Sequence, residues 1–193
     1  MTPPLGAFKA AVLGAAGLSS DYIILLAKQT ASDDTSLAFT SLIDSTYKEY
    51  VFSIENWNPS DDGSYVYFQA GAAYNTTITS GAFRSENSES SGDNFGYAIA
   101  NAQHQGTGEQ IIYHETDADS DSCVSGDLHL FIPSDTTYVK TWYCKFQGTK
   151  NANTSMEVYT SGVFNTTSAL TQVRFKPSSG TFDGTIRMYG VVH

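Results

Sequence analysis

The chain of 193 residues is poor in charge, cysteine and proline. Only 16% of its residues are Asp, Glu, Lys or Arg, and it has five prolines and two cysteines, Cys123 and Cys144. Two cysteines are too few for a disulfide scaffold, and they lack the clustered spacing of a zinc site. A charge-poor chain rich in Ser, Thr, Tyr and Gly suits sheets better than helices, which favour Glu, Lys, Ala and Leu. The composition therefore predicts an all-β protein.

Positive charge is also scarce. The formal net charge is -10, and the ten Lys and Arg residues are scattered along the chain. Binding to nucleic acid requires clustered basic residues, so we expect no nucleic-acid partner. Acidity of this kind is typical of a soluble, self-repelling surface.

Catalytic signatures are missing as well. The sequence contains no Gly-x-Ser-x-Gly elbow, no phosphate-binding glycine loop and no His-Glu-x-x-His or His-x-His arrangement. Paired carboxylates would need only proximity in the fold, and nothing in the sequence marks a particular pair. We therefore expect a protein that is not an enzyme and that has no cofactor.

One acidic loop is a candidate cation site. Asp117, Asp119 and Asp121 alternate and could offer oxygen ligands to Ca²⁺. The loop lacks the glycine and the distant glutamate of a helix-loop-helix calcium site. We favour a solvated acidic loop over a metal site.

Residues 1–20 differ from the rest of the chain because they are small, rich in Ala and Gly and almost uncharged. One interpretation is a secretory signal, although its only charge is the late Lys9 and two prolines precede it. We prefer an extended N-terminal arm, too short and too interrupted by glycine to cross a membrane. Its apolar side chains need a surface to cover them, so we predict that they bind a partner: Leu5, Phe8, Val12 and Leu13.

Alternating apolar and polar residues predict eight to ten strands with turn signals between them. Residues 173–188 read as a closing hairpin around Pro177-Ser-Ser-Gly180, and residues 47–70 as a second hairpin around Asp62-Gly63. Residues 126–146 give a third hairpin. Residues 22–28 form an apolar run typical of a buried strand, and residues 85–92 have the composition of a mobile surface loop.

Two packed antiparallel sheets are the arrangement that covers so many apolar faces. We therefore predict an antiparallel β-sandwich, jelly-roll-like, with residues 1–20 as the N-terminal arm and residues 21–193 as a single sandwich domain. His129, between Leu128 and Leu130, should point away from the core by alternation.

The two cysteines have two predicted states. If the third hairpin turns at Pro133-Ser134, Cys123 and Cys144 face each other at the distance that a disulfide requires. The alternative is a pair of reduced, separately buried thiols, because proteins assembled in the cytosol start reduced.

Tyrosine (12 residues) and phenylalanine (11 residues) are numerous. Exposed tyrosines on a sandwich can stack on sugars, which would favour a receptor-binding role. Most such side chains belong to the core or to cross-strand pairs, so Tyr65 with Tyr67 and Tyr47 with Tyr50 are weak evidence for that role.

Three stretches together resemble small virion proteins of tailed bacteriophages, particularly phages of marine bacteria and cyanobacteria. They are residues 38–52, which start Ala38-Phe-Thr-Ser-Leu-Ile-Asp, residues 126–140, which start Gly126-Asp-Leu-His-Leu-Phe-Ile, and residues 162–190, which end Gly184-Thr-Ile-Arg-Met-Tyr-Gly190. The resemblance covers residues 22–192 and rests on structural turns, so it transfers no functional residue.

The resemblance implies a virion location at the particle surface after assembly in the host cytoplasm. A capsid decoration or cement protein would bind the major capsid protein or other virion proteins, as a homo-oligomer and usually a trimer, with no membrane partner. The alternative is a tail-fibre, adaptor or receptor-binding component. The sandwich fills the chain and leaves no shaft or coiled coil, which favours decoration.

Overall fold

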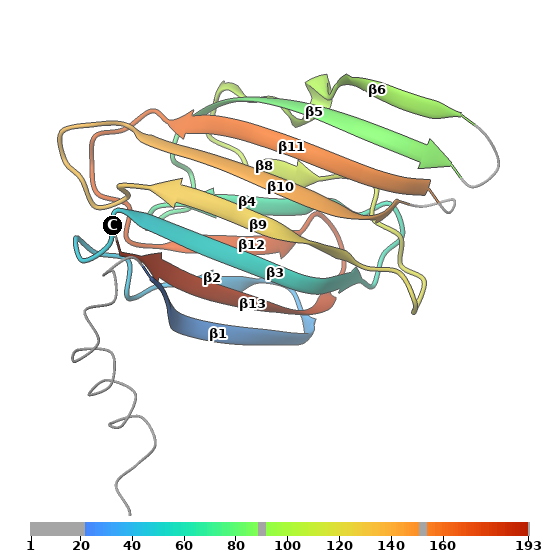
Figure 1. Cartoon of the computed structure of the whole chain (residues 1–193), viewed down its shortest axis with the longest axis horizontal. Helices are drawn as coiled ribbons and strands as arrows, with labels where there is room; N and C mark the ends of the chain where they lie inside the picture. Colours follow the sequence, from blue (N-terminus) through green and yellow to red (C-terminus); the bar gives the residue numbers. More distant parts are fainter. Residues whose placement is uncertain (1–21, 89–91, 151–153, 193) are drawn as a thin grey trace, which may run out of the picture.

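The computed structural model describes residues 22–88, 92–150 and 154–192, which fold into two packed layers of strands (Figure 1). These residues form thirteen strands and one short 3₁₀ helix, and every strand pair is antiparallel. The predicted all-β antiparallel sandwich is confirmed, while a jelly-roll-like strand order stays a prediction. The predicted arm, residues 1–20 with Leu5, Phe8, Val12 and Leu13, lies outside the described residues.

The larger layer is a nine-stranded sheet with edge strands β1 and β6, drawn from bottom to top in Figure 1. Its order is β1 (Ile23–Asp34), β13 (Phe182–Val191), β3 (Glu49–Pro59), β9 (Val124–Phe131), β10 (Lys140–Lys150), β11 (Thr154–Phe164), β5 (Ile78–Ser88) and β6 (Asp93–Tyr97), with β7 (His104–Gly106) also paired to β5.

The smaller layer is a four-stranded sheet that lies behind the larger one in Figure 1. Its order is β2 (Leu37–Phe39), β12 (Val173–Pro177), β4 (Val66–Ala70) and β8 (Gln110–Tyr113). The 3₁₀ helix η1 (Ile99–Asn101) follows β6. We call the face of the larger sheet that is turned away from the smaller sheet the outer face.

The core between the sheets follows the two-residue period of the strands. In β3, Tyr50, Phe52 and Ile54 are fully buried, as their alternation predicts. Asn56 has a φ of 53° and interrupts the pairing with β9. This irregularity resets the period, so Trp57 also points into the core, where it stacks on Phe182 at 3.6 Å between ring centroids.

Two predicted hairpins are wrong, although their turns are correct. β3 and β4 lie in different sheets, as do β12 and β13, so the turns at Gly63 and Gly180 carry the chain from one layer to the other. The two crossings lie side by side, because Ser60 N donates to Thr181 O (2.9 Å). A hairpin and a crossing show the same alternation, since both strands bury one apolar face in the same core.

The third predicted hairpin, between β9 and β10, is confirmed, but its register differs from the prediction. Cys144 pairs with Leu128, and Cys123 lies next to Thr149, whose N–H donates to its carbonyl. Thr149 comes five residues after Cys144 in β10, so the two cysteines are about 17 Å apart along the strand direction. The disulfide alternative is wrong and both thiols are free, with Cys144 buried and Cys123 half-buried.

Two further expectations about exposure are corrected by the positions of the strands. The apolar run at residues 22–28 does form a strand, but β1 is an edge strand and Ile23 and Leu25 are 64% and 52% exposed. Residues 85–88 are not part of a loop, because they extend β5 and pair with β11 and β6. A polar composition is compatible with a strand here because half of its side chains face solvent.

Candidate functional site

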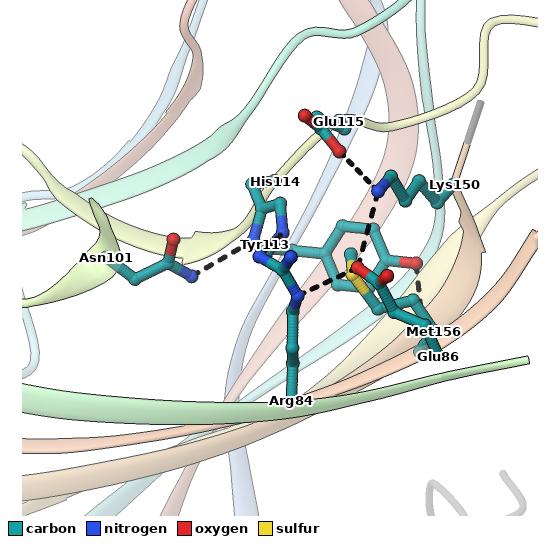
Figure 2. Close-up of polar contacts among 8 residues, drawn as sticks. All are labelled: Arg84, Glu86, Asn101, Tyr113, His114, Glu115, Lys150 and Met156. Atoms are coloured by element: carbon teal, nitrogen blue, oxygen red, sulfur yellow. Dashed lines mark hydrogen bonds and ion pairs between the residues drawn. The ribbon is translucent and has the colours of Figure 1, made fainter. Parts of the chain in front are cut away.

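A cluster of polar side chains fills the interior where the smaller sheet ends. His114, directly after β8, is only 5% exposed and lies between Arg84 of β5 and Asn101 of η1 (Figure 2). Arg84 Nη1 is 2.9 Å from His114 Nε2, and the Asn101 amide is 3.2 Å from Nδ1. Because a guanidinium can only donate, Nε2 is the acceptor and the imidazole proton lies on Nδ1. The Asn101 atom nearest Nδ1 is Nδ2, which also donates, so this tautomer requires the amide to be turned with Oδ1 toward the ring.

Ion pairs continue the cluster toward the open end of the sheet. Arg84 Nε lies 2.8 Å from Glu86 Oε1, and Lys150 Nζ lies 3.3 Å from the same oxygen and 2.6 Å from Glu115 Oε2 (Figure 2). Two cations therefore face two carboxylates around a neutral His114. The charges balance at the margin of the fold, where exposure of the side chains rises from 13% at Glu86 to 41% at Glu115.

The electrostatics favour a neutral His114 beside a charged Glu115 and a charged Lys150. Burial, and then the Arg84 charge, lower the pKa of His114. The hydrogen bond from Lys150 lowers the pKa of Glu115, while its carboxylate partners raise the pKa of Lys150 against the effect of burial. Both ring nitrogens of His114 are engaged, so this imidazole is not placed to act as a base toward a molecule from solvent. The cluster acts as structural support for the strands above it.

A row of aromatic side chains crosses the outer face of the larger sheet. His129 stacks on Tyr143 (4.5 Å between centroids), and Tyr159 stacks on Phe83 (5.1 Å). Tyr143 and Tyr159 join these two pairs at 6.0 Å. Phe95 ends the row, tilted by 54° against Phe83 and 75% exposed. Phe95 is therefore the most exposed ring of the row.

The strand register places the outer side chains of β10, β11, β5 and β6 in three rows. The first is Lys145, Tyr159, Phe83 and Tyr97, the second is Gln147, Glu157, Ser85 and Phe95, and the third is Thr149, Ser155, Asn87 and Asp93. Aromatic side chains therefore give way to amides, hydroxyls and carboxylates along the strands.

This part of the outer face is hollowed. One depression of about 340 Å³ is lined by Phe83, Ser85, Phe95, Lys145, Glu157 and Tyr159. It shares Ser85, Phe95 and Glu157 with a second depression of about 600 Å³. The second shares Asn87, Gln147 and Ser155 with a third of about 750 Å³. We call these three adjoining depressions the outer groove.

The other end of the same sheet exposes a different surface. Tyr22, Ile23, Ile24 and Leu25 are all exposed at the start of β1, and Lys28 is the first charged residue of that strand. We call these four residues the apolar edge. In sequence, Asp21 alone separates them from the predicted arm, residues 1–20.

The predicted site residues are not brought together. Asp119 and Asp121 are exposed, as expected for a solvated loop, but Asp117 is buried, where it accepts hydrogen bonds from Asp119 N (3.0 Å) and Ser122 Oγ (3.1 Å). Burial raises the pKa of the Cys144 thiol to about 12, so this cysteine is not a nucleophile at neutral pH. Within the described residues, no group of three or more His, Cys, Asp or Glu is placed to hold a metal ion.

The histidines show what alternation can find. His129 points outward as predicted, with Nδ1 2.6 Å from Glu49 Oε1. His114 was missed, although the same period-two rule aligns it with the buried Gln110 and Ile112. The outer groove was missed because it depends on the pairing of four strands that are distant in sequence.

No helix among the described residues is long and apolar enough to cross a membrane. Compared with known protein families, with curated proteins and with solved structures, the chain matches none of them.

Proposed function

We propose that the protein is a structural component of a bacteriophage particle, and within it a capsid decoration or cement protein. It binds the major capsid protein or another virion protein at the particle surface, after assembly in the host cytoplasm. It works by binding and not by catalysis. The resemblance of residues 38–52, 126–140 and 162–190 to phage virion proteins supports the origin, and the fold supports the role.

The apolar edge is the observation that carries the proposal. An exposed apolar edge strand is an aggregation hazard in a free protein, because its backbone groups and side chains are open to pairing. Ile23, Ile24 and Leu25 expose hydrophobic side chains at such an edge, and within β1 no charged residue comes before Lys28. A contact with another virion protein would cover them. The predicted arm, residues 1–20, would extend the same contact with Leu5, Phe8, Val12 and Leu13.

Assembly as a closed oligomer, most simply a trimer, fits this role. Each copy then contributes one apolar edge to the shell, and several modest contacts add up to a strong attachment. The net charge of -10 opposes extensive association between copies, because like charges repel. It therefore favours small contacts between the subunits of the oligomer.

A reconstruction of the intact particle by electron cryomicroscopy tests the proposal. We expect copies of the sandwich at repeated positions on the capsid, grouped as closed oligomers, with the apolar edge against the shell. Monomers at isolated sites would contradict the oligomer, and absence of the protein from the particle would contradict the whole proposal.

A tail-fibre, adaptor or receptor-binding role is the second candidate. The outer groove favours it, because a protein that only bridges capsomers has no need of a hollow lined by exposed Phe83 and Phe95. The same reconstruction separates the two candidates, since this role places the sandwich on the tail.

A further inference from the structure

The outer groove combines two kinds of chemistry at short range. Phe83 and Phe95 are 43% and 75% exposed at one end, and they lie beside Glu157 and Lys145, which form an ion pair of 2.6 Å. Toward the end of the strands, Gln147, Asn87 and Ser155 replace the rings. Aromatic surface next to a few polar groups is the usual make-up of a small-ligand site.

The polar groups suit a ligand rich in hydroxyl groups. Amides and hydroxyls both donate and accept hydrogen bonds, and a carboxylate accepts several. Gln147 is exposed, and its amide forms no hydrogen bond with the rest of the described chain. The Asn87 amide donates to Asp93 Oδ1 (2.8 Å), which leaves its oxygen as an acceptor. A sugar offers hydroxyl groups for these partners and an apolar ring face for Phe95.

The charge of the groove selects among sugars. Four carboxylates line the groove, those of Glu86, Glu157, Asp93 and Asp121. Glu86 is paired with Arg84 and Lys150 from the cluster beneath, and Lys145, the one cation among the groove residues described, is paired with Glu157. Sulfated, uronic or phosphorylated glycans would be repelled by this balance. A neutral saccharide meets no such penalty.

The position of the groove argues against protein ligands. Most of it lies on the face of β10, β11 and β5, whose backbone groups are already paired to neighbouring strands. A peptide could add as a strand only along the edge of β6, and not across the groove. A second copy of the chain would bring an equally acidic surface against these carboxylates. The three rows span about 14 Å along the strands, which leaves room for a short chain of sugar rings.

We propose that the outer groove binds a neutral oligosaccharide, with sugar rings against Phe95 and Phe83 and hydroxyl groups on Glu157, Gln147 and Asn87. This function goes beyond attachment to a shell, because it gives the protein a ligand outside the particle. It does not depend on the capsid role, since the apolar edge and the groove lie at opposite ends of the sheet.

The purified protein tests the proposal by affinity electrophoresis in native gels that contain mannan, laminarin or dextran, with alginate as the anionic comparison. We expect at least one neutral polysaccharide to retard the protein and alginate to leave it unretarded. Titration calorimetry with the retarding polysaccharide then gives the affinity. Failure of all three neutral polysaccharides, or retardation by alginate alone, would overturn the proposal.

Three variants locate the site. Phe95→Ala should weaken binding by about tenfold, the loss expected for one aromatic stacking contact, and Glu157→Gln should weaken it with the shape preserved. Tyr138→Ala removes a ring that is 64% exposed in the loop before β10, outside the groove, and should leave the affinity unchanged. Thermal unfolding checks that each variant is folded. Equal losses in Phe95→Ala and Tyr138→Ala would place the ligand elsewhere and overturn the assignment.

Sedimentation tests the remaining explanation for the exposure of Phe95, which is a contact between two copies of the chain. If wild-type protein is oligomeric and Phe95→Ala is monomeric with no change in sugar affinity, this face is a contact between copies and the groove proposal is wrong. Sugar binding in a variant that no longer attaches to particles would uphold the groove and leave the capsid role to be judged separately.

Discussion

The two ends of the larger sheet finish in different ways. At the β1 end, the apolar edge exposes Ile23, Ile24 and Leu25, and Lys28 is the first charged residue of the strand. At the β6 end, exposed rings lie next to carboxylates and amides in the outer groove. Lasting protein contacts are the more hydrophobic ones, whereas reversible ligand sites mix rings with polar groups. One rigid sheet can thus carry an attachment surface and a ligand surface without overlap.

The interior beneath the larger sheet is also apolar under most strands and polar at the β5 end. The smaller sheet ends at β8. On the inner face of β5, Arg84 therefore contacts Glu86 and His114, whereas the other strands contact apolar side chains (Figure 2). Hydrogen bonds and ion pairs depend strongly on geometry, whereas apolar packing tolerates substitution better. The β5 end should therefore be the more sensitive to single changes and to pH.

The largest expected effect comes from charging the apolar edge. The double variant Ile23→Lys, Leu25→Lys should abolish attachment to particles, measured by co-sedimentation, because two buried charges would face an apolar contact. Its free energy of unfolding should change by no more than about 0.5 kcal/mol, since both side chains are exposed in the free protein.

Ile99→Lys is the matched control, because Ile99 is 70% exposed at the other end of the sheet. It should attach normally. Attachment of the double variant at the wild-type level would refute the assignment of the apolar edge.

The next largest effect concerns the cluster beneath β5. Arg84→Met leaves His114 Nε2 without its donor and Glu86 without one of its cations, so it should lower the free energy of unfolding by about 1–3 kcal/mol. Arg187→Met, which removes an ion pair with Glu55 on the outer face, should cost less than about 1 kcal/mol. Urea unfolding measures both, and equal losses would mean that the cluster is not special.

Acid should weaken the same cluster. The pKa of His114 is lower in the folded protein than in the unfolded chain, so the unfolded chain binds the proton first as pH falls below about 6.5. This contribution is present above that pH and is lost on acidification, with a slope of at most about 1.4 kcal/mol per pH unit.

His114→Gln removes the titrating group and should flatten the dependence of unfolding free energy on pH between about 6.5 and 5. His129→Gln, on the outer face, is measured beside it to show the effect of losing an imidazole outside the cluster. A slope in His114→Gln as steep as that of the wild type would assign the acid sensitivity to other groups.

The smallest effect is expected at the outer groove itself. Lys145→Gln breaks an ion pair whose side chains are 58% and 46% exposed, so it should change the free energy of unfolding by less than about 1 kcal/mol. A loss above about 2 kcal/mol would show that the Lys145–Glu157 pair stabilises the sheet. That result would weaken the proposal that Glu157 contacts a ligand.

Local sequence signals predicted the strands and turns well, because they depend on near neighbours. Alternation found the buried face of β3, and the glycines at positions 63 and 180 marked real turns with positive φ. Alternation cannot say which sheet a strand joins, and for that reason it predicts hairpins at the two points where the chain crosses between sheets. It also cannot count the residues of a turn, so Cys123 and Cys144 were placed opposite each other.

The candidate sites depended on pairing at long range and could not be predicted. An apolar run reads as buried whether its strand is central or at an edge, so residues 22–25 gave no sign of exposure. The groove needs Phe83, Phe95 and Glu157 from three strands in one register. His114 was accessible to the alternation rule, but its partner Arg84 comes from another strand.

Hydrogen exchange of the free protein and of the particle-bound protein tests the division of the sheet most directly. Peptides that cover residues 22–26 should become strongly protected in the particle, while peptides that cover residues 83–87 and 93–97 should exchange as they do in the free protein. Protection of residues 83–87 and 93–97 with no change at residues 22–26 would contradict the account.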